Sequence, residues 1–534
     1  MGPESLFGLD KVCDIHLVIE ADEWAKLQPP EDADWNIYEA FEQMGQDAEA
    51  GKHFHSEKST RPGLAGYLGV DHQYGRARIT LGGETLHDVG LRYKGNGTFL
   101  EGREQNKYSF KVDFDEYIED QEFRGLTKIN LQNNVTDPSY LREALSYELF
   151  REAGIPCSRV GWARVKLTIP GKFEGKNLGL YSLVEQVGKR FLKDRYGSAK
   201  GLLIKPSTFS AFRHLGLDWE EYEKAYFPKT KASDEQKKKL IDFTRLVHEA
   251  SAADFDQQIE SYLDTDQFLR FLAVNVLLSN LDSFLGGTQN YYAYLEPESD
   301  KFQLLPWDLD HSFGSFVLIG KPESRRDLSI REPHWGENLL IDRMLAIPRY
   351  DTAYRAHLAA YLDTIFAEDK LRQQIADTAS FLRPLVEETA SRSSALKRFE
   401  ATVADTPTGK EPHALNLFVA QRRVSVAQQL SGQSSGQELE LEKMPDHRKL
   451  LGAGIPLIAA LLLNLIVYIC AAVAGFKGSV GWGILNLLTY PIAPMIYGIR
   501  IRKDLGRRAA IATLISSGIL AVAIGNAIWM LSSL

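Results

Sequence analysis

Two carboxylates follow an apolar run in the stretch "LLPWDLDHSFG", residues 304–314. Asp308 and Asp310 are separated by one residue, so at the end of a strand their side chains can face the same side. Hard cations such as Mg²⁺ bind carboxylate oxygens and often take phosphate oxygens as further ligands. The pair is therefore a candidate metal site. Two solvated loop acids, or acids that cap a helix near Ser312, explain this stretch alone equally well.

A second group of polar residues precedes it in "SNLDSFLGGTQNYYAYLE", residues 279–296. Asp282 is expected at the end of a helix, and Asn290 opens a strand that we expect to pair with 301–309 as a hairpin. This hairpin would bring Asn290 beside Asp308. Phosphoryl transfer needs such a set, because one acid orients the acceptor hydroxyl while an amide and a second acid hold metal on the phosphates.

A third segment, "LRYKGNGTFLEGREQNKYSFKVDF" at 91–114, is expected to form a strand, a glycine-containing turn and a second strand. Gly95 and Gly97 would let the backbone approach a phosphate closely. Lys107 and Lys111 would share one face of the second strand and could neutralise phosphate oxygens. Taken alone this is an ordinary hairpin, so the argument depends on the order of all three segments.

Together these segments resemble the CotH kinase family, which is named for a spore coat protein and has an atypical protein-kinase-like fold. The resemblance covers about residues 10–423 and is strongest in "RYKGNGTF", "KYSFKVDF", "SYLREALSYELFREAGIP", "NLGLYSLVEQV", "NLDSFLGGTQNYYAY" and "LLPWDLDHSF". It implies transfer of the γ-phosphate of ATP to protein Ser or Thr, or to the chain itself. ATP and Mg²⁺ or Mn²⁺ are the implied cofactors.

The resemblance also implies roles for individual residues. Asp282 would be the catalytic acid, and the metal ligands would be Asn290, Asp308 and Asp310. The expected ATP-binding residues are Gly95, Gly97, Lys107, Lys111, Arg142 and Glu185. Either Glu143 or Glu148 would pair with the strand lysine, and the sequence leaves both open.

The bulk composition narrows the function further. The chain has 534 residues and a net charge of −9, which gives no support to nucleic-acid binding. Its 3 cysteines lie far apart and form no zinc-binding spacing. The N-terminal stretch lacks the basic and apolar regions of a signal peptide.

Three charge-free stretches follow at the C-terminal end, at 450–476, 478–499 and 509–534. A spanning helix needs about 20 apolar residues, so each is a candidate membrane span. Basic residues at 500–508 would place the preceding domain on the cytoplasmic side of a bacterial inner membrane. The alternatives are a re-entrant second segment, which contains Pro491 and Pro494, and a buried helical hairpin of a soluble domain.

The sequence thus predicts an α+β protein with a two-lobed, kinase-like domain at 1–430, a linker at 431–449 and a transmembrane region at 450–534. The β-rich N-lobe would cover about 1–190 and the helical C-lobe about 191–430. The predicted function is that of a membrane-anchored atypical protein kinase whose protein substrate the sequence does not identify. The alternatives are a catalytically silent surface or coat scaffold or adhesin, and ATP-dependent modification of a non-protein acceptor.

Overall fold

The computed structural model describes residues 2–30, 33, 35–49, 56–207, 210–287, 289–389, 393–405 and 413–439. Residues 1–441 form one compact unit. Its strands are β1 (Val12–Ile19), β2 (Gly75–Leu81), β3 (Glu84–Lys94), β4 (Ser109–Asp113), β5 (Lys128–Gln132), β6 (Val160–Ile169), β7 (Phe173–Glu185), β8 (Leu202–Ile204), β9 (Tyr291–Glu296) and β10 (Lys301–Pro306).

The α-helices are α1 (Ala21–Lys26), α2 (Ile37–Glu49), α3 (Leu64–Tyr67), α4 (Gly97–Gln105), α5 (Arg142–Glu152), α6 (Lys189–Tyr196), α7 (Trp219–Tyr226), α8 (Asp234–Glu249), α9 (Ala252–Gln258), α10 (Thr265–Leu277), α11 (Pro322–Arg326), α12 (Leu339–Leu345), α13 (Pro348–Asp363), α14 (Glu368–Thr389), α15 (Ser393–Val403) and α16 (Leu415–Leu430). Two short 3₁₀-helices lie at Pro3–Leu6 and Ile259–Ser261.

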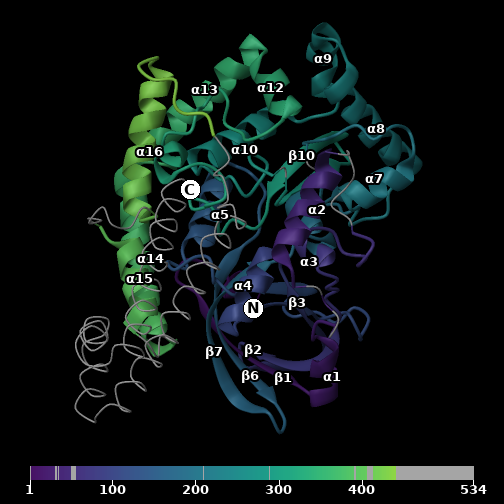
Figure 1. Ribbon diagram of the computed structural model, residues 1–534, viewed down its shortest axis with the longest axis vertical. Helices are drawn as coiled ribbons and strands as arrows, with labels where there is room; N and C mark the ends of the chain where they lie inside the picture. The colour runs from purple at the N-terminus through teal and green to yellow at the C-terminus, as the bar shows by residue number, and fades with distance from the viewer. Residues whose placement is uncertain are drawn as a thin grey trace, which may run out of the picture. The chain divides into compact units, whose positions relative to one another are not determined.

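The first seven strands close into a barrel in the order β1-β2-β3-β4-β5-β7-β6. Figure 1 labels β1, β2, β3, β6 and β7 of this barrel in the lower part of the view. Most neighbours are antiparallel, but β1 and β6 pair in parallel, with Val12 opposite Trp162 and Val18 opposite Thr168. Gly82 and Gly83, both with positive φ, make a tight turn between β2 and β3. The closed sheet therefore depends on a contact between residues far apart in the sequence.

Alternating side chains fill the barrel. In β2 the buried positions alternate with exposed ones, as a strand with one buried face requires. Tyr93, Phe110, Leu131 and Leu183 point to the same hydrophobic cluster inside the barrel. The intervening residues of β3, β4 and β5 lie on the outer face, where polar side chains can meet the rest of the unit.

A second sheet, in the order β10-β9-β8, carries the hairpin expected from the sequence. Pro306 pairs with Tyr291, so the end of β10 lies beside the start of β9. Helix α10 packs against β10 and is buried on almost all sides, as its largely apolar sequence dictates. Helix α5 contacts both α10 and β6, and so joins the barrel to the helices.

The predicted fold class and localisation are corrected by this structure. The strands close into a seven-stranded barrel instead of giving the expected N-lobe of a two-lobed kinase, because β1 reaches β6 in a parallel pairing that strand periodicity does not reveal.

The prediction of three membrane spans, and with it the prediction of an inner-membrane protein, is also wrong. No helix in the described ranges is long and apolar enough to cross a bilayer. Even the 22-residue α14 contains Pro384 and several charged side chains. The predicted spans at 450–476, 478–499 and 509–534 lie outside the described residues.

Candidate active site

The hairpin of β9 and β10 places Asn290 and Asp308 at the same end of the second sheet, one residue before Tyr291 and two after Pro306. Both residues have left-handed backbone conformations, with φ of 54° and 59°. Phe313 shares this conformation, with φ of 55°. Such conformations are uncommon outside glycine and gather at functional sites, so the ends of this hairpin are candidates for function.

Asp308 is connected to the barrel through an amide. Gln132, at the end of β5, donates its Nε2 to Asp308 Oδ1 at 2.8 Å. The Oε1 of the same amide accepts a hydrogen bond from Lys94 Nζ, at the end of β3, at 2.7 Å. Two consecutive hydrogen bonds thus join Lys94 at the end of β3, Gln132 at the end of β5 and Asp308 after β10.

Glu143, on α5, is the acid beside this lysine. It is 1% exposed, and neither carboxylate oxygen has a hydrogen bond among the described residues. Burial raises the pKa of Glu143 well above its usual range, and Asp308 and Asp310 add to the effect. Glu148 instead pairs with Arg151 at the surface of the same helix. Of the two glutamates that the sequence leaves open, Glu143 is the one beside a lysine, and that lysine is Lys94 of β3, not Lys107 or Lys111 of the second strand as expected.

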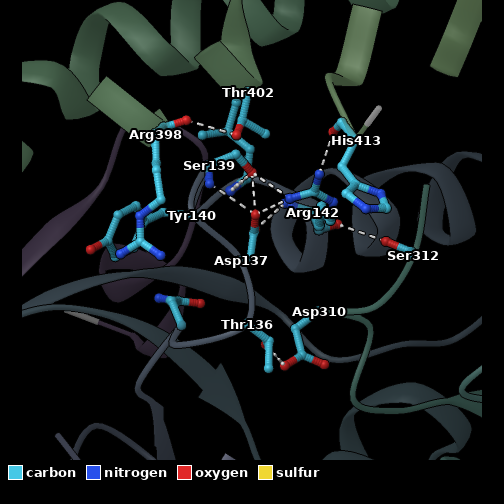
Figure 2. Close-up of polar contacts among 12 residues, drawn as sticks. Thr136, Asp137, Ser139, Tyr140, Arg142, Asp310, Ser312, Arg398, Thr402 and His413 are labelled. Carbon is cyan, nitrogen blue, oxygen red and sulfur yellow. Dashed lines mark hydrogen bonds and ion pairs between the residues drawn. The ribbon is translucent and has the colours of Figure 1, made fainter. Parts of the chain in front are cut away.

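Asp310 is buried and accepts a hydrogen bond from Thr136 Oγ1 at 2.7 Å (Figure 2). Burial raises the pKa of Asp310, and the charge of Asp308 raises it further, while His311 acts in the opposite direction. The two acids of the opening motif therefore lie close enough to repel each other.

Asp282 joins the same electrostatic group. Burial raises its pKa to about 7, and the charges of Asp310 and Asp308 add to that rise against the effect of His311. Its Oδ1 accepts from Gln289 Nε2 at 2.9 Å, and its main-chain oxygen accepts from Asn290 Nδ2 at 2.8 Å. The expected catalytic acid and its expected metal-binding partner are thus in contact.

His311 lies among the acids. Burial alone would lower its pKa, but the carboxylates of Asp310, Asp282, Glu101 and Asp308 together raise it above the ordinary value. Glu101 comes from α4, which begins at the glycine turn. The surrounding carboxylates therefore favour the protonated form of the imidazole.

Basic side chains line the outer face of the barrel next to these acids. Arg92 and Lys94 alternate along β3, and Lys111 on β4 is directly opposite Arg92. Lys205, which follows β8, lies 5.5 Å from the ring of Trp307 and 5.6 Å from that of Tyr292. We refer to Arg92, Lys94, Lys111 and Lys205 as the cationic wall.

The three lysines of this wall are held in surroundings that disfavour their charge. Burial lowers the pKa of Lys94 and lowers that of Lys111 well below its ordinary value. Burial also lowers the pKa of Lys205, to about 7. Asp308 opposes the effect at Lys94 and Lys205. Like charges grouped in this way favour the binding of an anion with several negative charges.

Lys107 lies elsewhere. It precedes β4, and its Nζ donates to the main-chain oxygen of Leu180 at 2.8 Å. The ammonium lies 4.9 Å from the ring of Tyr181 and 5.4 Å from that of Tyr140. Burial lowers its pKa to about 7. The structure therefore separates the two lysines that the sequence placed on one face.

The glycine turn leads into a helix instead of directly into a second strand. Gly95 has φ of 97°, and a Cβ there would lie 2.4 Å from Thr98 Oγ1, so this position requires glycine. Its carbonyl accepts hydrogen bonds from Arg61 at 3.0 Å and His72 at 3.1 Å. Gly97 is the first residue of α4, and a Cβ there would meet nothing within 4 Å.

Arg142 and Glu185 have other partners. Arg142 is 1% exposed, pairs with Asp137 and donates to the main-chain oxygen of His413 at 2.6 Å (Figure 2). Glu185 accepts from Arg159 and, at 3.1 Å, from Arg195. Neither side chain bonds to the acids described above. Both are engaged in holding the ends of α5 and β7.

The carboxylates of Asp308 and Asp310 are the candidate ligands for a divalent cation. Within the described ranges, no three His, Cys, Asp or Glu side chains already form a metal-binding cluster. Asp308 and Asp310 nevertheless use only one oxygen each in the hydrogen bonds to Gln132 and Thr136. The buried oxygens of Glu143 accept no hydrogen bond from the part of the chain that the structure describes. The remaining oxygens of Asp308 and Asp310, next to the buried carboxyl group of Glu143, therefore fit a hard cation.

Seven residues of the site did not emerge from the sequence: Arg92, Glu101, Gln132, Thr136, Lys205, Gln289 and His311. His311 directly follows Asp310, and Lys205 ends the apolar run "GLLIK", so both carried a weak signal. Nothing in the local sequence distinguishes Gln132 or Thr136, because their roles come from contacts with residues more than a hundred positions away.

Comparison with known protein families identifies the family of this chain. The model for the CotH kinase protein family matches residues 91–426, which include all the predicted site residues. The chain belongs to the CotH kinase protein family. The match begins within β3, so β1 and β2 lie outside the region that defines the family.

Two known proteins, one bacterial and one fungal, are similar to this chain. The inner spore coat protein H of Bacillus subtilis is 26% identical over 316 residues, which cover 59% of this chain and 82% of that protein. Invasin CotH7 of Rhizopus delemar is 23% identical over 257 residues, which cover 46% of this chain and 41% of the fungal protein.

Proposed function

We propose that the protein is an ATP-dependent phosphotransferase that transfers the γ-phosphate to a hydroxyl group of a protein. The observation that carries this proposal is the juxtaposition of Asp282, Asp308 and Asp310, which influence one another electrostatically, with the cationic wall. Phosphoryl transfer requires acids for metal and acceptor next to cations for phosphate. Membership of the CotH kinase family supports the same reaction.

In this mechanism the cationic wall binds the phosphate chain of ATP. Asp308 acts electrostatically on Lys94 and Lys205, and Lys111 and Arg92 extend the positive charge along β3 and β4. Asp308 and Asp310, with Asn290 as the further expected ligand, would hold Mg²⁺ or Mn²⁺. A bound divalent cation supplies charge neutralisation at the phosphate oxygens.

Asp282 orients the acceptor hydroxyl and takes its proton. A pKa of about 7 suits a general base near neutral pH. Gln289 and Asn290 fix the position of this residue through its side-chain and main-chain oxygens. The protein side of the reaction is thus positioning and electrostatic stabilisation.

The test uses the full-length chain with ATP labelled at either the α- or the γ-phosphate, in the presence of Mg²⁺ or Mn²⁺. Label from the γ-position on the chain or on an added protein is the expected result. Transfer from the α-position would indicate adenylylation instead. Absence of transfer from both positions, with acceptor proteins of varied composition, would contradict the proposal.

A second candidate function is non-catalytic binding in a coat or at a surface. The relatives named as a spore coat protein and an invasin favour it, as does the absence of a three-residue metal cluster among the described residues. This candidate predicts that ATP and Mg²⁺ together leave the melting temperature of the wild-type protein unchanged. The phosphotransferase predicts a clear rise.

A further inference from the structure

The side chain of Gln132 lies between a cation and an anion that would otherwise attract each other directly. Its Oε1 accepts from Lys94 Nζ at 2.7 Å, and its Nε2 donates to Asp308 Oδ1 at 2.8 Å. The side chain is buried, so water does not replace these bonds easily. The orientation of the amide follows from chemistry, because an ammonium only donates and a carboxylate only accepts.

A direct contact between Lys94 and Asp308 would change what each can bind. Opposite charges attract strongly where water is excluded, so the ammonium would neutralise the carboxylate. A divalent cation would then compete with Lys94 for the same oxygen. With the amide between them, both charged groups have a hydrogen-bonding partner. Asp308 keeps one oxygen without a hydrogen bond to the described residues, and Lys94 stays on the cationic wall beside Glu143.

We propose that Gln132 is a positioning residue that keeps Lys94 away from Asp308, so that Asp308 can hold a divalent cation while Lys94 contacts phosphate. The inference rests on the proposed function, since it assigns Asp308 to a cation. It adds a specific role for an uncharged residue of β5. Gln132 itself touches neither the acceptor nor the transferred phosphate in this scheme.

The test measures Mn²⁺ binding to the full-length protein by calorimetry, without nucleotide. Gln132→Ala should weaken Mn²⁺ binding by about tenfold, the range seen when groups that orient metal ligands are removed. Lys94→Met alone should leave the affinity equal to or above that of the wild type. The double variant Gln132→Ala/Lys94→Met should regain the affinity of Lys94→Met, because the competing ammonium is gone.

The matched control is Asn130→Ala, which removes another buried amide from β5. Asn130 Nδ2 donates to the main-chain oxygen of Val184 at 3.4 Å and to Gln186 Oε1 at 3.2 Å, away from Asp308. This variant should not change the Mn²⁺ affinity. Gln132→Met, which keeps the side-chain volume, serves if Gln132→Ala does not fold, and the double variant is then made with it.

Each outcome is decisive. If the double variant binds Mn²⁺ as weakly as the single Gln132 variant, Gln132 acts through local structure and the inference is overturned. An unchanged affinity in the single variant overturns it as well. If the wild type itself binds no Mn²⁺, the proposed function fails together with the inference, and this result differs from the other two.

Discussion

Asp282, Asp308 and Asp310 have the same chemical group but different surroundings, so their substitutions should differ. Asp308→Asn should remove most Mg²⁺-dependent ATP binding without unfolding the protein, because an amide is a poorer ligand for a hard cation. Asp282→Asn should leave that binding nearly intact and stop phosphate transfer. Melting temperatures with and without ATP and Mg²⁺, together with a transfer assay, separate the two effects.

Asp310→Asn decides what the second acid of the opening motif does. If it reproduces Asp308→Asn, both acids bind metal. If nucleotide binding is unchanged, Asp310 serves mainly to anchor Thr136, with which it shares a hydrogen bond of 2.7 Å. Because burial raises the pKa of Asp310, its loss of charge should stabilise the metal-free protein at neutral pH.

The two lysines of the glycine-turn segment should also differ. Lys111→Ala should weaken ATP binding about tenfold, since a hydrogen bond to a charged group contributes about 1.5–3 kcal/mol. Lys107→Ala should leave ATP affinity within about twofold and instead lower stability, because the ammonium bonds to Leu180 and lies over two tyrosine rings. Calorimetry with ATP is the measurement, and equal effects of both substitutions would contradict this assignment.

The individual acids were predictable because local spacing carried the signal. Asp308, Asp310, Asp282 and Asn290 occur near the ends of recognisable elements, and the structure brings them to one site. Gln132 was not predictable, because its function depends on two partners from other elements. The roles of all these residues remain predictions until the variants are measured.

At the scale of elements, α5 begins with a buried ion pair. Among the described residues, Arg142→Met leaves the carboxylate of Asp137 buried with Ser139 and two main-chain amides as partners, and it should cost about 3–5 kcal/mol of unfolding free energy. Denaturation in urea measures it. Arg151→Ala, on the same helix, removes an exposed pair with Glu148 and should change stability by about 0.5 kcal/mol or less. A small effect of Arg142→Met would contradict this structural role of the ion pair and would favour the ATP-binding role that the sequence predicts for Arg142.

Elements whose signal is periodic were predicted well, and elements fixed by tertiary contacts were not. The pairing of β9 with β10 followed from two apolar strands joined by a short turn. The nine-residue α4 was missed, because its glycines favoured a hairpin and its sequence has little helical amphipathicity. The conformation after Gly95 therefore had to come from the structure.

At the scale of the whole molecule, the buried acids make stability depend on pH. The pKa of Glu143 is raised in the folded state above its unfolded value of 4.5, so its favourable contribution is present below that value and is lost as the pH rises. Glu143→Gln should therefore raise the melting temperature more at pH 8 than at pH 5, in metal-free buffer. Glu148→Gln is the control, because that side chain is at the surface. A shift that does not vary with pH would contradict the buried-acid explanation.

The overall α+β content was readable from the sequence, but the closed barrel was not. Strand alternation indicates that β1 and β6 each have a buried face. It does not indicate that they are neighbours, since parallel partners are separated by long connections. The expected membrane architecture rested on composition alone, and the described helices give it no support.

The closure of the barrel has a practical consequence for anyone who wishes to produce the domain. The match to the family model starts at residue 91, but the ring of strands starts at Val12. A fragment cut at residue 91 would lose β1, β2 and much of β3, and would expose the hydrogen-bonding edges of β6 and the remainder of β3. Uncovered edges recruit strands from other molecules. The segment that the family model matches is thus shorter than the unit that contains the whole barrel, and expression trials should keep the N-terminal strands.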